Sequence, residues 1–172
     1  ANFLPHTLVL LDTCTLSPLK FYPVKTIAGK SSRVSAVYTS PPSNSFFAAF
    51  KDIPELWEIS YADEPPHGFG MWMHDYRVDS GENTEPVPFP FRRITVKDYL
   101  DDLFFTDNYI SIVGVTHAVS GQVIDMDVRK AIVQKLDLPG KPHFSSGVSF
   151  NYKGQEVLAV PNFRMGVVSV LN

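Results

Sequence analysis

The sequence predicts an all-β chain that forms a partial β-propeller of two to three four-stranded antiparallel blades. Short runs of β-branched and aromatic residues recur along it, separated by 14 prolines and 10 glycines. One pattern is repeated at a constant offset: N-F followed by V-L-L-D near the start matches N-F followed by S-V-L-N at the end. Repeated short strands that end in polar turn residues are typical of propeller blades, which are four-stranded meanders.

The composition is that of a globular protein and limits the classes of partner. Of 172 residues, 44% are hydrophobic and 19% are charged, which suits one domain with a sizeable core. The net charge of −3 provides no basic face for phosphates, so nucleic acid is not an expected partner. No apolar run approaches the roughly 18 residues of a membrane span. The single cysteine, Cys14, excludes an internal disulfide and a C-x-x-C-H haem attachment site, and no His spacing predicts a metal site.

The first third of the chain predicts five short strands. T-L-V-L-L-D is an apolar run that ends in a turn residue, and R-V-S-A-V-Y-T, S-F-F-A-A-F-K and L-W-E-I-S-Y follow with β-branched or alternating apolar residues. Because only a few residues separate the last three, we expect them to form an antiparallel meander. The expected ranges are Thr7–Asp12, Leu16–Val24, Arg33–Thr39, Ser45–Lys51 and Leu56–Tyr61.

A proline-rich stretch then interrupts the pattern and predicts a long loop insertion at residues 62–98 within a single domain, 1–172. The strand pattern is lost from Ala62 to Pro90, where an acidic cluster and the motif M-W-M-H-D-Y-R occur. Loops of this length in compact domains usually carry a function. Strands are expected to resume at Tyr109–Thr116, Gln122–Asp127, Lys130–Leu138, Gly147–Tyr152, Glu156–Val160 and Val167–Leu171.

The chain is too short to close a propeller on its own. At about 40–45 residues per blade it holds two to three blades plus the insertion, whereas propellers close with about four to eight. Open sheet edges at both ends invite pairing with other strands. We therefore expect a fragment of a ring, or a chain that needs partners, and the remaining blades of the propeller are the partner that the pattern predicts.

The segment Leu138–Phe150, L-P-G-K-P-H-F-S-S-G-V-S-F, carries a histidine where a new strand is expected to begin. It joins two strand-rich parts of the chain through a link rich in proline and glycine. A histidine at the inner edge of a repeated β-unit could reach a ligand on the axis of a ring, and imidazole transfers protons near neutral pH. The alternative for His143 is a solvated loop side chain.

Several motifs, in order along nearly the whole chain, resemble one family. They are S-R-V-S-A-V-Y, S-F-F-A-A-F-K-D-I-P-E-L-W-E-I-S-Y, M-H-D-Y-R, L-D-D-L-F-F, D-M-D-V-R-K and G-K-P-H-F-S-S-G. Together they resemble the haem d1 domain of the cytochrome cd1 nitrite reductase family, and they are most similar to its dihydro-haem d1 dehydrogenase branch. The resemblance implies an eight-bladed propeller with haem d1 on its axis, of which this chain covers the middle.

The resemblance also implies a haem d1-dependent oxidoreductase of the periplasm. The expected activity is that of a dihydro-haem d1 dehydrogenase-like, electron-transferring enzyme of haem d1 biosynthesis and denitrification, with the isolated fragment inactive. Its expected partners are haem d1 or its dihydro precursor and an electron-transfer protein. The alternatives are a cytochrome cd1-type nitrite reductase domain and a haem-free propeller that serves as a binding scaffold. The proximal iron ligand, and any c-type haem domain, are expected outside this chain.

The resemblance implies two side chains that can exchange protons, one histidine and one aspartate, on the distal face of the haem. The resemblance places His143 there as a proton-transfer residue, and it places Asp101, next to Asp102, where the reductases have a second histidine. A carboxylate at Asp101 would repel nitrite yet could accept a proton; the alternative is an acidic turn. The reductases have a basic residue three positions after the first histidine, and here that position is Ser146, which argues against reduction of an anion such as nitrite.

Three further residues are implied as haem contacts. His74, in M-W-M-H-D-Y-R, could act as a catalytic residue or a distal ligand, with Tyr76 beside it in the cofactor-binding set; the alternative is packing of an aromatic and methionine run. Arg33 could pair with the carboxylates of haem d1, because Arg binds carboxylates bidentately; the alternative is a surface ion pair. The charged residues that we expect to be solvated are Lys51, Asp52, Arg92 and Arg93.

Overall fold

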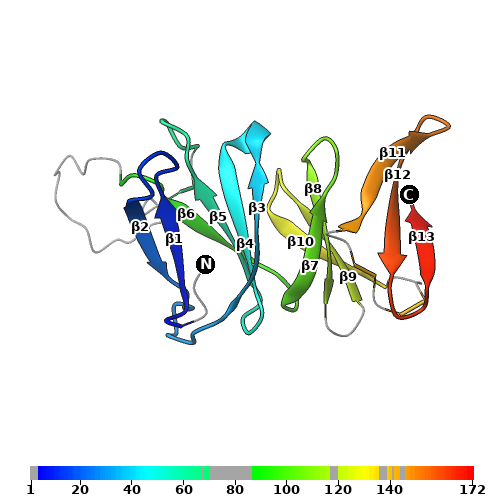
Figure 1. The fold of residues 1–172 in the computed structure, drawn as a ribbon, viewed down its shortest axis with the longest axis horizontal. Helices are drawn as coiled ribbons and strands as arrows, with labels where there is room; N and C mark the ends of the chain where they lie inside the picture. The colour runs from blue at the N-terminus through cyan, green and yellow to red at the C-terminus, as the bar shows by residue number, and fades with distance from the viewer. Residues whose placement is uncertain are drawn as a thin grey trace.

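Four antiparallel sheets, one after another in chain order, make up the fold (Figure 1). The computed structural model describes residues 4–66, 68–69, 87–116, 120–135, 139–140, 142–143 and 146–172. Within these residues every strand pairing is antiparallel, and η1 (Pro41–Ser43) is a single turn of 3-10 helix. The prediction of an all-β chain of consecutive antiparallel blades is confirmed.

Each sheet is called a blade here and is numbered along the chain. Blade 1 consists of β1 (Thr7–Leu11) and β2 (Pro18–Pro23). Blade 2 consists, in spatial order, of β3 (Val34–Ser40), β4 (Ser45–Phe50), β5 (Glu55–Ser60) and β6 (Phe91–Thr95). Blade 3 consists of β7 (Leu100–Phe105), β8 (Ser111–Thr116), β9 (Ser120–Asp125) and β10 (Lys130–Lys135). Blade 4 consists of β11 (Val148–Tyr152), β12 (Gln155–Asn162) and β13 (Val167–Leu171).

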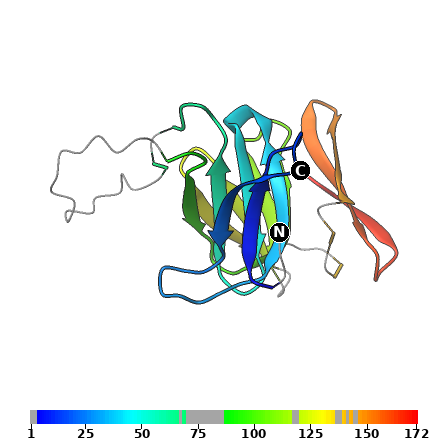
Figure 2. The ribbon, with the colours of Figure 1, turned by 60° about the vertical axis from the view of Figure 1, so that its left-hand side comes forward.

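The blades pack face to face, and the period of two along each strand divides its side chains between two cores. On β4, Phe47 and Ala49 are buried against blade 3, whereas Ala48 and Phe50 are buried against blade 1. A strand covered on both faces needs apolar residues at successive positions, which is what S-F-F-A-A-F supplies. Figure 2 shows blade 1 in front of blade 2, in agreement with this packing.

Like strands of neighbouring blades lie next to each other. The first strands of blades 2 and 3, β3 and β7, contact each other, and so do their last strands, β6 and β10. The two blades are therefore stacked with their strand order aligned. Stacking of this kind brings equivalent positions of β3 and β7 side by side, and this pair of strands positions the candidate site described below.

The turn that joins β11 to β12 shows how the sequence sets the hairpins. Tyr152 pairs with Gln155, so two residues form the loop, and these are Lys153 (φ 52°) and Gly154 (φ 82°). A two-residue type I′ turn requires positive φ at both positions, and glycine adopts such a φ without strain. The sequence Lys-Gly at these two positions therefore suits the turn.

The predicted boundary of the insertion, 62–98, needs correction. Strand β6 lies inside that range and pairs with β5, so it closes blade 2. The sequence of β6, F-R-R-I-T, gives a weak strand signal because two adjacent arginines are typical of a solvated segment. The expectation that Arg92 and Arg93 are solvated is wrong: their side chains are only 15% and 25% exposed.

A buried carboxylate explains how these charges are accommodated. Glu58 is 1% exposed and accepts a hydrogen bond from Nε of Arg92, directly opposite on β6, at 2.7 Å. It accepts a second from Nε of Arg129, at 3.1 Å, in the turn between β9 and β10. Because Arg129 belongs to blade 3, the Glu58 carboxylate links blade 2 to blade 3. Paired charges with several hydrogen bonds can be buried where single ones cannot.

No helix among the described residues is long and apolar enough to cross a membrane.

Candidate functional site

The first strands of blades 2 and 3 carry a β-bulge at the same position. The register of β3 shifts between Val34 and Ala36, and that of β7 shifts between Leu100 and Asp102. The extra residues are Ser35 and Asp101, the second residue of each strand. A bulge bends its strand and redirects nearby side chains, and bulges are common beside functional sites. The two bulges therefore aim side chains from two blades toward one region.

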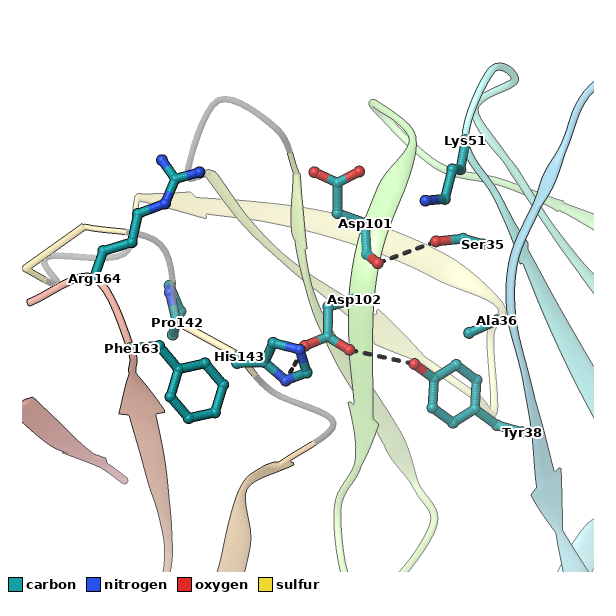
Figure 3. A pocket seen from close by; sticks show the side chains of 10 residues that line it. All are labelled: Ser35, Ala36, Tyr38, Lys51, Asp101, Asp102, Pro142, His143, Phe163 and Arg164. Carbon is teal, nitrogen blue, oxygen red and sulfur yellow. Dashed lines mark hydrogen bonds and ion pairs between the residues drawn. The ribbon is translucent and has the colours of Figure 1, made fainter. Parts of the chain in front are cut away.

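A direct hydrogen bond holds the two bulges together. The Oγ of Ser35 donates to the backbone carbonyl of Asp101 at 3.0 Å, and Figure 3 shows this bond across the top of the site. Both residues are partly buried. The relative position of β3 and β7 is thus fixed by a polar contact at the point where their side chains are redirected.

A cavity of about 730 Å³ opens next to the bulges (Figure 3). This volume is within the range of about 300–1,000 Å³ that is usual for ligand sites. Blades 2, 3 and 4 and the link before β11 all contribute to its wall. The lining residues are Ser35, Ala36, Tyr38, Lys51, Asp101, Asp102, Pro142, His143, Phe163 and Arg164.

His143 is held in the cavity wall by the backbone on both sides of it. Its amide donates to the carbonyl of Pro161 at the end of β12 at 3.0 Å, and its own carbonyl accepts from the amide of Ser146 at 3.2 Å. The imidazole lies 5.4 Å, between ring centroids, from the ring of Phe163. Its side chain is half exposed, so it can reach a ligand in the cavity.

The carboxylate that faces this imidazole belongs to Asp102. Its Oδ2 lies 3.6 Å from Nδ1 of His143, while its Oδ1 accepts hydrogen bonds from the hydroxyl of Tyr38 (3.3 Å) and the amide of Leu103 (3.1 Å). The Asp102 side chain is only 12% exposed. Oγ of Ser146 lies 3.1 Å from the same nitrogen, Nδ1. The imidazole is therefore oriented by polar groups at one ring nitrogen.

The phenol of Tyr38 acts as a donor toward Asp102. Burial of the ring, and then the negative charge of Asp102, raise the pKa of Tyr38 to about 12. The hydroxyl thus stays protonated at neutral pH. It comes from β3 in blade 2, whereas Asp102 comes from β7 in blade 3 and His143 from the link into blade 4. Two blades and the link into a third therefore supply one group each.

The structure brings together two of the predicted site residues, His143 and Asp101, but with one difference. Both line the cavity, yet the carboxylate next to the imidazole is that of Asp102. Figure 3 shows the Asp101 carboxylate pointing toward the top of the cavity, away from His143. The reason is the bulge, since the extra residue shifts the alternation of side chains by one position.

Arg33, predicted to pair with haem carboxylates, is engaged elsewhere. Its Nε and Nη2 donate to the two carboxylate oxygens of Asp52 at 3.0 and 2.7 Å. These hydrogen bonds hold the pKa of Asp52 well below its ordinary value. The structure thus favours the alternative, a surface ion pair, and Arg33 is not among the described residues that line the cavity.

Two other predicted contacts, His74 and Tyr76, lie outside the described residues. The insertion that carries them follows β5, which ends at Ser60. Just before β6 begins, the carbonyl of Pro90 accepts a hydrogen bond from the amide of Ser60 at 2.9 Å. Ser60 pairs with Ser45, at the end of blade 2 opposite to Lys51. The role of these two residues stays a prediction.

Several cavity residues were not predicted as site residues. Lys51 was expected to be solvated, and it is exposed but lines the cavity together with Arg164 from the turn between β12 and β13. Tyr38 and Phe163 gave no signal, because aromatic residues in or next to a strand normally indicate a core. Among the described residues no cluster of three or more His, Cys, Asp or Glu side chains could hold a metal ion.

The arrangement can bind a flat, partly apolar ligand that carries carboxylates. Pro142, Phe163 and Ala36 provide apolar surface. Lys51 and Arg164 provide two positive charges, and Arg is well suited to bidentate contact with carboxylates. The imidazole of His143 beside a carboxylate can accept and release a proton.

Comparison with known proteins gives a consistent result. The model of the cytochrome D1 heme domain family matches residues 1–172. The dihydro-heme d1 dehydrogenase of Pseudomonas aeruginosa is 40% identical over 172 residues, which are 99% of this chain and 30% of that protein. A solved structure of dihydro-heme d1 dehydrogenase NirN in complex with DHE superposes with a TM-score of 0.79 at 37% identity, and covers 99% of this chain and 32% of that one. The chain thus spans about a third of these relatives, and it belongs to the cytochrome D1 heme domain family.

Proposed function

We propose that this chain is part of a haem d1-type dehydrogenase that binds dihydro-haem d1 in the cavity between blades 2, 3 and 4. The observation that carries the proposal is the His143–Asp102 pair, 3.6 Å apart, at the wall of a cavity that also presents Lys51 and Arg164. The relatives support the substrate class, since one is a dihydro-heme d1 dehydrogenase and the other is such an enzyme in complex with DHE.

The proposed reaction removes two hydrogen atoms from a side chain of the substrate macrocycle. A carbon–carbon single bond becomes a double bond, and two protons and two electrons leave. The electrons pass to an electron-transfer protein, which is the required oxidant. One proton passes to the imidazole of His143 and from there to solvent, since this side chain is half exposed, and the second proton is released to solvent directly.

The residues present fit a macrocycle with carboxylate substituents. Haem d1 carries several carboxylates, and the two cations Lys51 and Arg164 lie on the cavity wall, on blades 2 and 4 respectively. The apolar surface of Phe163 and Pro142 suits the flat face of the ring. When bound, the macrocycle supplies the redox centre, whereas this chain supplies binding, orientation and proton transfer.

The acidic side chains favour dehydrogenation over nitrite reduction. Asp101 and Asp102 both line the cavity, and carboxylates repel a small anion such as nitrite. Ser146 stands where the reductases carry a basic residue, and its Oγ contacts the His143 ring at 3.1 Å. A cytochrome cd1-type nitrite reductase domain and a haem-free scaffold remain the alternatives that the experiment below tests.

Five further properties belong to the same proposal. The electron acceptor is a separate electron-transfer protein, and the setting is haem d1 biosynthesis and denitrification in the periplasm. The remaining blades of an eight-bladed propeller complete the ring around the macrocycle. The proximal iron ligand, and a c-type haem domain if one exists, lie on parts of the protein other than this chain. The isolated 172-residue chain is expected to be inactive.

The test is to mix the purified whole protein, of which this chain is a part, with dihydro-haem d1 and follow the absorption spectrum. We expect tight binding and, after an electron acceptor is added, conversion to the spectrum of haem d1. A haem-free scaffold would leave the spectrum of the free compound unchanged. A nitrite reductase would bind haem d1 and consume nitrite with an electron donor, without converting the dihydro compound. Either of these results would overturn the proposal.

A further inference from the structure

We propose that Asp102, held by Tyr38, is a positioning residue that keeps the proton of the neutral His143 ring on Nδ1 and leaves Nε2 as the basic nitrogen. The proposal rests on the proposed function for its catalytic meaning, because it identifies the nitrogen that accepts the substrate proton. The position of the proton on the His143 ring is a property of the haem-free protein, so it can be measured without substrate.

The first step of the argument is the side of the ring that Asp102 faces. Its Oδ2 approaches Nδ1 of His143 to 3.6 Å. This separation is longer than a formed hydrogen bond, yet catalytic hydrogen bonds are often long before substrate binds. A carboxylate accepts and never donates when it is ionised. The carboxylate of Asp102 therefore favours the tautomer in which Nδ1 carries the proton over the tautomer in which Nδ1 carries the lone pair.

The second step is that Asp102 is itself held in place. Tyr38 and the amide of Leu103 both donate to Oδ1 of Asp102, so Oδ2 is the oxygen that turns toward the ring. Because burial and the Asp102 charge raise the pKa of Tyr38 to about 12, the phenol donates over the whole physiological range. The bulge in β7 sets this orientation, since it puts Asp102 opposite Val115 after the register shift.

The third step concerns Ser146, which competes for the same nitrogen. Its Oγ lies 3.1 Å from Nδ1 and can either accept a proton from Nδ1–H or donate to a bare Nδ1. With the carboxylate of Asp102 facing the same nitrogen, the accepting arrangement places a proton between Nδ1 and both oxygens, whereas a bare Nδ1 would turn its lone pair toward the carboxylate. The other charged residues in the wall of the cavity are Asp101, Lys51 and Arg164.

The consequence is a defined direction of proton transfer. A neutral imidazole with its proton on Nδ1 carries its lone pair on Nε2, and it becomes an imidazolium when Nε2 takes a proton. The negative charge of Asp102 stabilises that imidazolium at the moment it forms. Asp102 and Tyr38 would thus act through His143 and not on the substrate.

The experiment measures the tautomer directly. Nitrogen-15 labelling of histidine in the haem-free protein gives the chemical shifts of both ring nitrogens, and the signal of His143 is identified by its loss in His143→Ala. Spectra are recorded over a range of pH, and the tautomer is read where the shifts of both ring nitrogens no longer change with rising pH, so that the ring is in its neutral form. We expect mostly the Nδ1–H form in the wild type and mostly the Nε2–H form in Asp102→Asn, because the Asn amide can donate to Nδ1.

Three control variants separate the explanations. Asp101→Asn removes the same charge from the neighbouring residue and should leave the Nδ1–H form dominant. Tyr38→Phe should give a mixture of the two forms, since Asp102 keeps its charge but loses one anchor. Ser146→Ala should change little. An unchanged tautomer in Asp102→Asn, or a change in Ser146→Ala of the same size, would overturn the proposal whether or not dihydro-haem d1 is the substrate.

Discussion

The hydroxyl of Ser35 donates a hydrogen bond to the backbone carbonyl of Asp101, and this bond joins two β-bulges from two different blades. The bulge residues are the second residues of β3 and β7, and both line the cavity. The shape of the site therefore depends on contacts between blades as well as on the conformation of each strand.

Gly114 is expected to be essential for the bulge in β7. A Cβ at this position would lie 2.9 Å from Cδ2 of Leu100 and 3.2 Å from the backbone oxygen of Asp102. We expect Gly114→Ala to lower the free energy of unfolding by about 1–3 kcal/mol, because the core and the bulge must move to admit the methyl group. Chemical denaturation measures this change.

A double variant tests the cause of that loss. Leu100→Ala removes the side chain that the new methyl group meets first, although it leaves the contact with the Asp102 backbone. The loss in Leu100→Ala/Gly114→Ala should therefore be smaller than the sum of the two single losses. Strict additivity would show that the Gly114 effect does not arise at this contact.

Most of the fold could be predicted from the sequence, because strand signals are local. The ranges expected for β1 to β5 and β8 to β13 differ from the observed ones by a few residues at their ends. The two strands that were not predicted, β6 and β7, contain R-R and D-D. Their charges are paired or hydrogen-bonded to residues of other strands, such as Glu58 for Arg92 and Tyr38 for Asp102, and pairing across strands has no local signal.

The site was predicted only in part, for a similar reason. The histidine was found from its segment and the family resemblance, and an aspartate was expected near it. The sequence could not show that a bulge in β7 turns Asp102, and not Asp101, toward His143, because a bulge has no clear sequence signature here. Arg33 was assigned from its residue type, whereas its actual partner, Asp52, lies in the turn after β4.

The Glu58 carboxylate is expected to contribute strongly to stability between blades 2 and 3. Glu58→Gln removes the negative charge that pairs with Arg92 and Arg129. Breaking a buried ion pair costs about 3–5 kcal/mol, and the partial exposure of the two arginines puts the expected loss at the lower end. Chemical denaturation of Glu58→Gln measures this loss.

Glu55→Gln is the matched control for this variant. Glu55 pairs with Arg93 within blade 2 and is more exposed, with 15% of its side chain accessible against 1% for Glu58. We expect a smaller loss of stability in Glu55→Gln. An equal or larger loss would show that the link between blades is not the reason for the effect of Glu58.

Acid should weaken the contribution of Asp52 to stability. Hydrogen bonds from Arg33 lower the pKa of Asp52 in the folded state, so its contribution is present above the unfolded value of about 3.9 and is lost as pH falls through the folded value. The difference in Tm between wild type and Asp52→Asn should thus be largest near neutral pH and shrink below about pH 4. A constant difference down to the lowest pH at which the protein folds would contradict this prediction.

Lys51 and Arg164 are expected to bind the carboxylates of the macrocycle. Hydrogen bonds to charged groups are worth about 1.5–3 kcal/mol, so Lys51→Ala and Arg164→Ala should each raise the Kd for haem d1 about tenfold or more. The effect should decrease at high salt. Arg33→Ala is the control: it removes a positive charge that pairs with Asp52, and it should leave the Kd unchanged. A larger increase in Kd from Arg33→Ala would show that Arg33, and not Lys51 or Arg164, contacts the carboxylates of the macrocycle.

The most direct test of the central claim is the turnover of dihydro-haem d1 by His143→Ala, compared with wild type. Binding should survive, because the backbone contacts of residue 143 with Pro161 and Ser146 do not need the imidazole. We expect the rate of conversion, followed by absorption at saturating substrate, to fall by about 10²–10⁴, as is typical when a general acid or base is lost. Normal binding together with conversion at the wild-type rate would show that His143 is a structural residue and that the proposed site is wrong.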